Sequence, residues 1–355
     1  MKIEKIDIHQ YHLALTHPMT VNNSQIETRE GFLIKIFADN ILGVGDVPPF
    51  PGLSRETLDE ALGQLAPACE SLIGLNFEQI KALLTPFWSF QYSPSVQFGL
   101  ETALHNLLAH DSNQSLAQTL SPNAAESIIT NVLLSNEMPV KRAKESVKAG
   151  FRTLKLKVGR YSADDEISVL KKIRKTVGSQ VRIRLDANRN WRLEEAIEFG
   201  RAIRDISVEY IEEPIVDPWQ LDSFINSTGL AVALDESLSS TEWPDFPGID
   251  AYVIKPGIIG GIFRSADLCR KAHKRGCKAV ISSAYLCAIG LSAAVHLAAA
   301  FATPGTAMGL NTSNRLKNDF SRGTLPIEEG RISLTALDDI LDPSAVTVKD
   351  ILHVE

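Results

Sequence analysis

The residues of this chain that could do chemistry stand near the ends of successive apolar runs. Residues 153–159, TLKLKVG, place Lys155 and Lys157 one residue apart, so both lysines share one face of a strand. The apolar residues that alternate with them suit the opposite face, and these are Leu154, Leu156 and Val158. A buried lysine is costly unless it has a partner, so we expect these lysines to point inward, toward groups of opposite charge.

Acidic residues end the next three apolar runs. The candidate carboxylates are Asp186 in VRIRLDAN, Glu212 or Glu213 in VEYIEEP, and Asp235 or Glu236 in LAVALDES. Alternation of side chains along a strand leaves open which member of each adjacent pair points inward. Three oxygen ligands that converge in this way favour Mg²⁺, which keeps positions open for water or substrate.

A second lysine position follows in IDAYVIKPG, where Lys255 ends the next run. A metal beside a substrate carboxylate stabilises the charge that forms when an α-proton leaves. A lysine whose pKa is lowered by burial and by nearby cations can take that proton near neutral pH. Lys255 could act as a second base, as an acid or as a fixed cation.

The elements that must position these residues alternate regularly from about residue 126. The expected strands are Ser127–Leu134, Thr153–Gly159, Val181–Asn188, Val208–Pro214, Leu230–Ser237, Ile249–Gly257, Cys277–Ser283 and Thr306–Thr312. Helical patterns lie between most of them. This order predicts a (β/α)₇β TIM-type barrel, in which catalytic groups gather at the C-terminal ends of the strands. No glycine-rich phosphate turn follows the first strand, which argues against an open dinucleotide-binding sheet.

The remainder of the chain predicts a second unit. Residues 1–125 form an α+β capping domain, residues 126–319 form the barrel, and residues 320–355 return to the capping domain. The net charge of −7 and pI near 5.7 argue against nucleic-acid or membrane partners. Four cysteines without a CxxC pair, and a strand-like N-terminus, favour a cytoplasmic protein. We expect a small-molecule carboxylate substrate and a monomer or small homo-oligomer.

The combined motifs resemble the enolase superfamily, muconate-cycloisomerase subgroup, over nearly the whole chain. The matching stretches are KLK at 155–157, LDAN at 185–188, IEEP at 211–214, LDES at 234–237 and VIKPGIIGG at 253–261. Within the subgroup the chain looks most like the o-succinylbenzoate synthase family, through PPFPGLSRETL, RLDANRNW, ISS and MGLNT.

The resemblance implies a mechanism and a role for each site residue. It implies Mg²⁺, with Mn²⁺ as an alternative, on Asp186, Glu212 and Asp235, and a syn dehydration in menaquinone or phylloquinone biosynthesis. Lys157 would be the base, and Lys255 would hold the enolate. The residues implied as substrate-binding or supporting are Lys155, Arg184, Asn188, Ser282, Ser283 and Gly309. Two capping loops, 16–29 and 47–53, would close over the barrel mouth.

Other activities of the same subgroup stay open at this point. N-succinylamino acid racemases use both lysines as bases, and muconate cycloisomerases share the catalytic set. Dipeptide epimerases are disfavoured, because GLNTSN at 309–314 lacks the aspartate pair that holds a substrate ammonium. A barrel that lost catalysis and only binds a ligand is disfavoured by the intact set of lysines and carboxylates.

Overall fold

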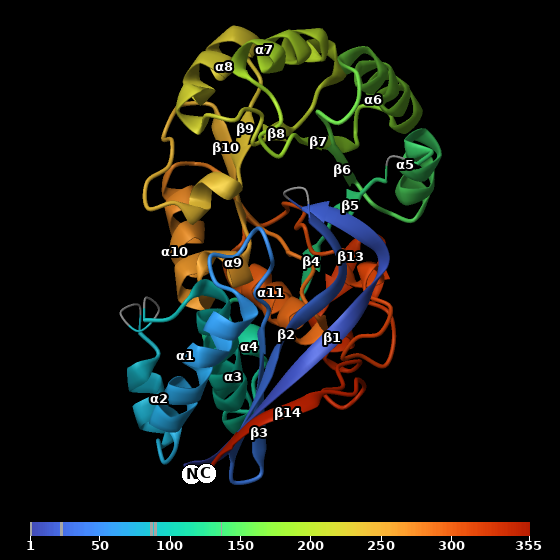
Figure 1. Cartoon of the computed structure of the whole chain (residues 1–355). Coiled ribbons are helices and arrows are strands. Elements are labelled where there is room, and N and C mark those ends of the chain that lie inside the picture. Colours follow the sequence, from blue (N-terminus) through green and yellow to red (C-terminus); the bar gives the residue numbers. More distant parts are fainter. Residues whose placement is uncertain (1, 22–23, 86–87, 89–90, 136) are drawn as a thin grey trace.

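The structure is a computed structural model that describes residues 2–21, 24–85, 88, 91–135 and 137–355. Two units lie one above the other in Figure 1, with the barrel at the top and the capping domain at the bottom. Both chain ends lie in the capping domain (Figure 1).

The barrel is built on a curled sheet of seven parallel strands. In spatial order these are β11 (Lys278–Ile281), β10 (Ile249–Ile254), β9 (Val232–Leu234), β8 (Tyr210–Glu212), β7 (Arg182–Asp186), β6 (Thr153–Lys157) and β5 (Val132–Leu133). The helices that follow them are α5 (Pro139–Lys148), α6 (Ala163–Val177), α7 (Leu193–Ala202), α8 (Leu221–Thr228), α9 (Pro256–Ile259), α10 (Gly261–Lys274) and α11 (Ala288–Phe301). Figure 1 shows α5 to α8 covering the outside of β6 to β9. The predicted barrel architecture is confirmed.

The eighth predicted strand, 306–312, is not a regular strand. Two isolated parallel bridges, Thr130 with Met308 and Ser282 with Gly309, instead place this segment between the chain before β5 and the end of β11. Gly309 permits the approach, since a Cβ there would lie 2.5 Å from Ser282 Oγ. The barrel therefore closes through single bridges rather than through a full ladder.

Alternation along the strands separates two cores. Leu154 and Leu156 belong to the large apolar core between the sheet and its helices. A small inner cluster fills the barrel beneath the strand ends, and its members are Tyr210, Ala233, Ala251, Val253 and Val280. Part of the barrel interior beneath the polar strand ends is therefore apolar.

The capping domain is a four-stranded antiparallel sheet with helices beside it. Its strand order is β14 (Lys349–Val354), β1 (Ile3–Val21), β2 (Ser24–Ala38) and β3 (Ile41–Val47). The accompanying helices are α1 (Leu58–Leu72), α2 (Phe77–Leu83), α3 (Pro94–Asp111) and α4 (Leu116–Leu120). A capping box fixes the start of α1, with Thr57 as N-cap and Glu60 as its reciprocal partner.

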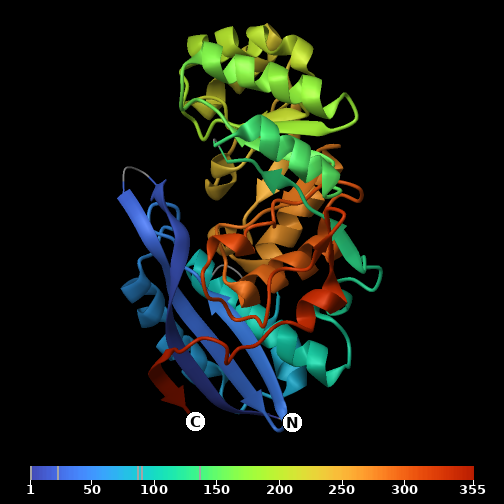
Figure 2. The same ribbon diagram turned by 90° about the vertical axis from the view of Figure 1, so that its right-hand side faces the viewer.

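The predicted loop at 16–29 is wrong over most of its length. β1 continues to Val21 and β2 begins at Ser24, so these residues are the far half of a long hairpin. Residues 22 and 23, at its tip, lie outside the described residues. Figure 2 shows this hairpin rising from the capping sheet beside the barrel.

The C-terminal tail contacts both units. β12 (Ile327–Glu328) and β13 (Arg331–Ser333) form a small sheet with β4 (Ser127–Ile129), and α12 (Leu334–Asp338) follows. The pairing of β4 with β13 explains why the first predicted barrel strand, Ser127–Leu134, is split into β4 and β5. The last strand, β14, then pairs with β1. Among the described helices, none has the length and apolar character to cross a membrane.

Candidate active site

The site lies where β6 to β10 end, and β6 contributes two lysines to it. Lys155 Nζ lies 2.9 Å from Asp186 Oδ2, and 2.8 and 2.7 Å from the two carboxylate oxygens of Glu212. Lys157 Nζ instead donates to Asn188 Oδ1 at 2.8 Å. The parallel register pairs Lys157 with Asp186 and Asp186 with Glu212, which brings these groups together.

The structure distinguishes the members of the two adjacent acid pairs. Glu212 faces Lys155, whereas the backbone of Glu213 turns into the left-handed region with φ 41°. The Glu213 carboxylate then accepts from the backbone N–H groups of Asp235 and Ser237, both at 2.8 Å. Glu213 therefore braces the loop after β9 rather than joining the inner carboxylates.

The second acid pair divides in the same way. Asp235 bonds to Lys255 Nζ, whereas Glu236 Oε1 accepts from Asn188 Nδ2 at 3.1 Å. Asn188 thus links Lys157 to Glu236, and this connection has no clear signal in the sequence pattern. Lys255 lies at the far side of the carboxylates from Lys157, as the order of the strands requires.

The surroundings push the two neighbouring lysines in opposite directions. Burial lowers the pKa of Lys157, and the cations of Lys155, Arg160 and Lys255 lower it further, while Asp186 opposes them. Burial also acts to lower the pKa of Lys155, but its carboxylate partners raise that pKa well above its ordinary value. Lys157 is therefore the lysine that gives up its proton more readily.

The inner carboxylates offer a donor set that suits a divalent metal. Asp186, Glu212 and Asp235 are 3%, 1% and 4% exposed and lie at the ends of three consecutive strands, with Asp235 directly after β9. Burial and the neighbouring acids raise the pKa of Glu212 well above its ordinary value, so the cluster needs positive charge close by. Lys155 and Lys255 supply that charge in this structure. Mg²⁺ could supply it as well, because this ion prefers oxygen ligands such as carboxylates. Across the described residues, no three His, Cys, Asp or Glu side chains already converge on one point as metal ligands.

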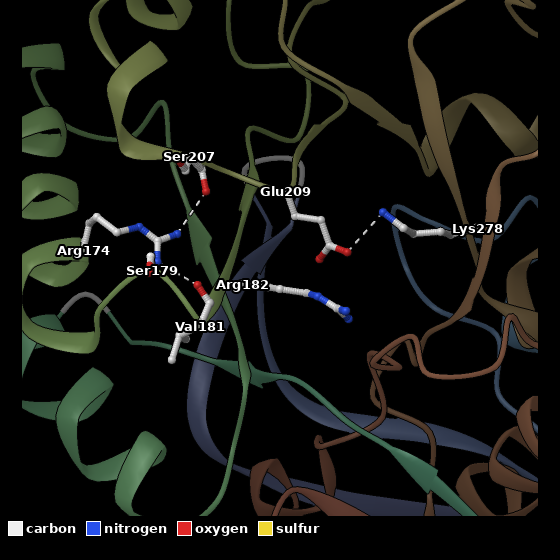
Figure 3. Close-up of a pocket in the computed structure, with 7 residues that line it drawn as sticks. All are labelled: Arg174, Ser179, Val181, Arg182, Ser207, Glu209 and Lys278. Carbon is white, nitrogen blue, oxygen red and sulfur yellow. Dashed lines mark hydrogen bonds and ion pairs between the residues drawn. The ribbon is translucent and has the colours of Figure 1, made fainter.

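Arg184, expected near the site, lies deeper in the barrel. It is fully buried, and its guanidinium donates to Glu209 at 2.7 Å and to the Ala307 carbonyl at 2.6 Å. Glu209 also lines a cavity of about 260 Å³ at the N-terminal ends of the strands, together with Arg182 and Lys278 (Figure 3). The structure does not bring Arg184 to the carboxylate cluster.

The expected substrate contacts stand at the end of β11 and across the closing bridge. Ser282 Oγ donates to the Gly309 carbonyl at 3.3 Å. Ser283 Oγ accepts from the Leu286 N–H and from the Thr312 hydroxyl, each at 3.1 Å. These residues are brought together at the mouth, next to the strand that leads to Lys255.

A capped parallel barrel with a ring of lysines and carboxylates at its strand ends defines the class of enolase-type barrel enzymes. Residues 139–337 match the model of the enolase C-terminal domain-like family, and residues 3–107 match that of the MenC N-terminal domain. The chain is 30% identical to o-succinylbenzoate synthase of Edwardsiella ictaluri over 90% of its length and 95% of that protein. It belongs to the o-succinylbenzoate synthase family.

Further relatives agree with this membership. The o-succinylbenzoate synthase of Pasteurella multocida is 29% identical, covering 92% of this chain and 95% of that protein. The chloroplastic protein PHYLLO of Arabidopsis thaliana is 33% identical over 92% of this chain, which spans only 22% of PHYLLO.

Solved structures of other enzymes share the fold. The L-Ala-D/L-Glu epimerase of Bacillus subtilis superposes with a TM-score of 0.80 at 25% identity, covering 99% of this chain and 100% of that chain. The dipeptide epimerase of Enterococcus faecalis, solved with Mg and a dipeptide, has a TM-score of 0.80 at 25% identity. The match covers 94% of this chain and 97% of that chain.

Proposed function

We propose that this chain is an o-succinylbenzoate synthase of menaquinone or phylloquinone biosynthesis. It would convert 2-succinyl-6-hydroxy-2,4-cyclohexadiene-1-carboxylate to 2-succinylbenzoate and water. Family membership supports the reaction, and one observation carries the assignment of the base. Among the three described lysines of the site, Lys157 bonds a neutral amide oxygen, whereas Lys155 and Lys255 are paired with carboxylates.

Lys157 performs both proton transfers in this proposal. In its neutral form it takes the proton from the carbon that bears the carboxylate, and the electrons of the broken C–H bond move into that carboxylate. The C–O bond then breaks, and Lys157 returns the proton to the departing hydroxyl, which leaves as water. One base suffices because a syn elimination removes both groups from the same face. Asn188 holds the amine in place, and Lys255 remains a cation opposite it.

Asp186, Glu212 and Asp235 would hold Mg²⁺, with Mn²⁺ as an alternative. The ion would supply positive charge against the substrate carboxylate while the α-proton leaves. The donor chemistry and burial of the three acids support this role. The small-molecule substrate would approach from the mouth, where Ser282 and Ser283 lie.

N-succinylamino acid racemase is the competing activity. A racemase needs a second base on the opposite face of the substrate, and Lys255 is the residue in that position. Burial acts to lower the pKa of Lys255, but Asp235 and Glu236 raise it above its ordinary value. The ion pair of Lys255 with Asp235 supports the role of a fixed cation rather than that of a second base.

The experiment that tests the proposal compares both reactions in one preparation. Purified protein with Mg²⁺ is given the cyclohexadiene carboxylate, followed by absorbance, and separately N-succinylamino acids, followed by polarimetry. We expect fast dehydration that EDTA abolishes. Fast racemisation without dehydration would assign the racemase, and full turnover in EDTA would contradict the metal role.

A further inference from the structure

A buried arginine of the capping domain joins two loops that border the site. Arg29, on β2, is 2% exposed. Its Nε donates to the Tyr285 carbonyl at 3.2 Å, its Nη1 to the Pro49 carbonyl at 3.1 Å, and its Nη2 to the Pro48 carbonyl at 3.2 Å. The guanidinium carbon also lies 4.3 Å from the centroid of the Phe50 ring. Each of the three guanidinium nitrogens thus donates to a backbone carbonyl, and the guanidinium also contacts an aromatic ring.

The first loop, between β3 and α1, touches the strand end that carries Lys255. Gly257 follows Lys255 by two residues, and a Cβ at Gly257 would lie 3.2 Å from Pro48 Cγ and 3.5 Å from Leu286 Cδ2. The loop that carries Pro48, called here the proline loop, and the loop after β11 therefore both pack against the backbone just after Lys255. A displacement of Pro48 would therefore change the packing around Gly257, two residues after Lys255.

The second loop, between β11 and α11, carries the expected substrate contacts Ser282 and Ser283. Tyr285 has φ 56°, a left-handed conformation that is sterically unfavourable for a residue with a side chain. The bond from Arg29 to the Tyr285 carbonyl supports this conformation from the capping side. On the barrel side, the loop is held by the bond from the Leu286 N–H to Ser283 Oγ.

A buried acid lies in the same interface as Arg29. Asp46, on β3, is fully buried, and its Oδ1 accepts from the Tyr11 hydroxyl at 2.7 Å. Burial lowers the pKa of Arg29, and the nearby Tyr11 and Asp46 oppose part of this shift. Arginine suits this position better than lysine, because its planar guanidinium can donate to several carbonyls at once, whereas lysine has a compact ammonium.

We propose that Arg29 is a positioning residue for substrate binding. Its guanidinium holds the proline loop and the β11–α11 loop in a fixed relative position, and the two loops together form one wall of the site. The serines at the end of β11 would then face the substrate in a constant geometry. The inference rests on the proposed function for its choice of substrate. It adds that the capping domain sets the binding geometry through a residue that the substrate does not touch.

The test is the steady-state kinetics of Arg29→Lys and Arg29→Met, measured well below the melting temperature of each variant. We expect KM for the cyclohexadiene carboxylate to rise about tenfold or more in both variants, with a smaller change in kcat. The matched control is Arg174→Lys. Arg174 also donates to backbone carbonyls, including that of Val181 at 2.7 Å, but at the opposite end of the barrel (Figure 3). The Arg174→Lys variant should have a lower melting temperature and an unchanged KM.

Two results would overturn the inference. One is wild-type KM in Arg29→Lys, which would mean that the charge alone suffices. The other is a loss of kcat at constant KM that follows the loss of folded protein, which would indicate a purely structural role. If Arg29→Lys does not fold, Gly257→Ala can be measured instead, because the added Cβ would contact Pro48 and Leu286 of the same two loops. An unchanged KM in Gly257→Ala would equally reject the proposal that these loops set the binding geometry.

Failure of the proposed function would look different. Folded wild-type protein that does not consume the precursor contradicts the function and says nothing against Arg29. In that case calorimetric binding of 2-succinylbenzoate replaces the kinetics, with weaker binding expected in Arg29→Lys than in Arg174→Lys. Equal binding in the two variants would reject the inference.

Discussion

Lys155 and Lys157 are separated by one residue and share a strand face, yet their surroundings divide their roles. Lys155 reaches two buried carboxylates and stays charged, whereas Lys157 reaches an amide oxygen and is surrounded by other cations. A base must be neutral before it can take a proton, so the neighbour that holds its own charge helps to keep Lys157 neutral. The pair acts as one fixed cation and one base.

Replacing Lys157 with alanine tests this division directly. Lys157→Ala should reduce the dehydration rate about 10³-fold, within the range for loss of a general base. Deuterium uptake at the substrate α-carbon, followed by NMR, should disappear with it. Lys278→Ala, at the opposite end of the barrel, is the matched control and should keep both rates. Normal exchange in Lys157→Ala would remove this lysine as the base.

The carboxylate cluster makes a prediction that does not depend on activity. Mg²⁺ should raise the melting temperature of the wild-type protein, because an ion that binds only the folded state stabilises it. Glu212→Gln removes one charged donor and should abolish most of that shift. Glu209→Gln changes another paired acid, whose side chain is 8% exposed, and this variant should retain the shift. Equal Mg²⁺ shifts in the two variants, read by differential scanning fluorimetry, would place the metal elsewhere.

At the scale of elements, the closing of the barrel depends on one bridge beside the site. Gly309→Ala would bring a Cβ within 2.5 Å of Ser282 Oγ, and such overpacking should destabilise the fold by about 1–3 kcal/mol. Adding Ser282→Ala removes the clashing oxygen and should recover a large part of that loss. Chemical denaturation of the two single variants and the double variant measures the coupling. Strict additivity would show that the hydroxyl is not the obstacle.

Strand alternation accounts for much of the site, and its limits are specific. It correctly turned Lys155 and Lys157 away from the leucines of TLKLK, because a period of two is all that this inference needs. It could not separate Glu212 from Glu213, since the strand ends there and the backbone of Glu213 is left-handed. It also could not give the depth of Arg184, which shares a face with Asp186 but pairs with Glu209 below it.

At the scale of the whole molecule, the contacts between units had no signal in local sequence. Arg29 bonds carbonyls 20 and 256 residues away, and such pairings depend on how the capping sheet sits against the barrel. The long β1–β2 hairpin, expected as a loop at 16–29, is another feature set by strand pairing rather than by composition. The pairing resumes at Met19 after an irregularity that follows Ala14. The order of the barrel units was predictable because each unit repeats the same local pattern, although single bridges replace the eighth predicted strand.

The interface between units also sets a pH dependence of stability. His105, on α3, is 8% exposed, its ring lies 5.6 Å from that of Phe263 on α10, and burial lowers its pKa from 6.5 to about 4. The unfolded chain therefore binds the proton more tightly, so this contribution is complete above pH 6.5 and is lost as the pH falls toward 4. Between pH 6.5 and 5, wild type should lose about 2 kcal/mol relative to His105→Gln. Denaturation curves of equal pH dependence for the two proteins would contradict this.

We expect this chain to dehydrate the cyclohexadiene carboxylate with a metal and Lys157. The initial rate of precursor loss, recorded by absorbance with folded wild-type protein in Mg²⁺, tests this expectation. We expect rapid conversion to 2-succinylbenzoate that stops in EDTA and resumes when Mg²⁺ is restored. Precursor that decays at the uncatalysed rate in the presence of folded, Mg²⁺-loaded protein would contradict it.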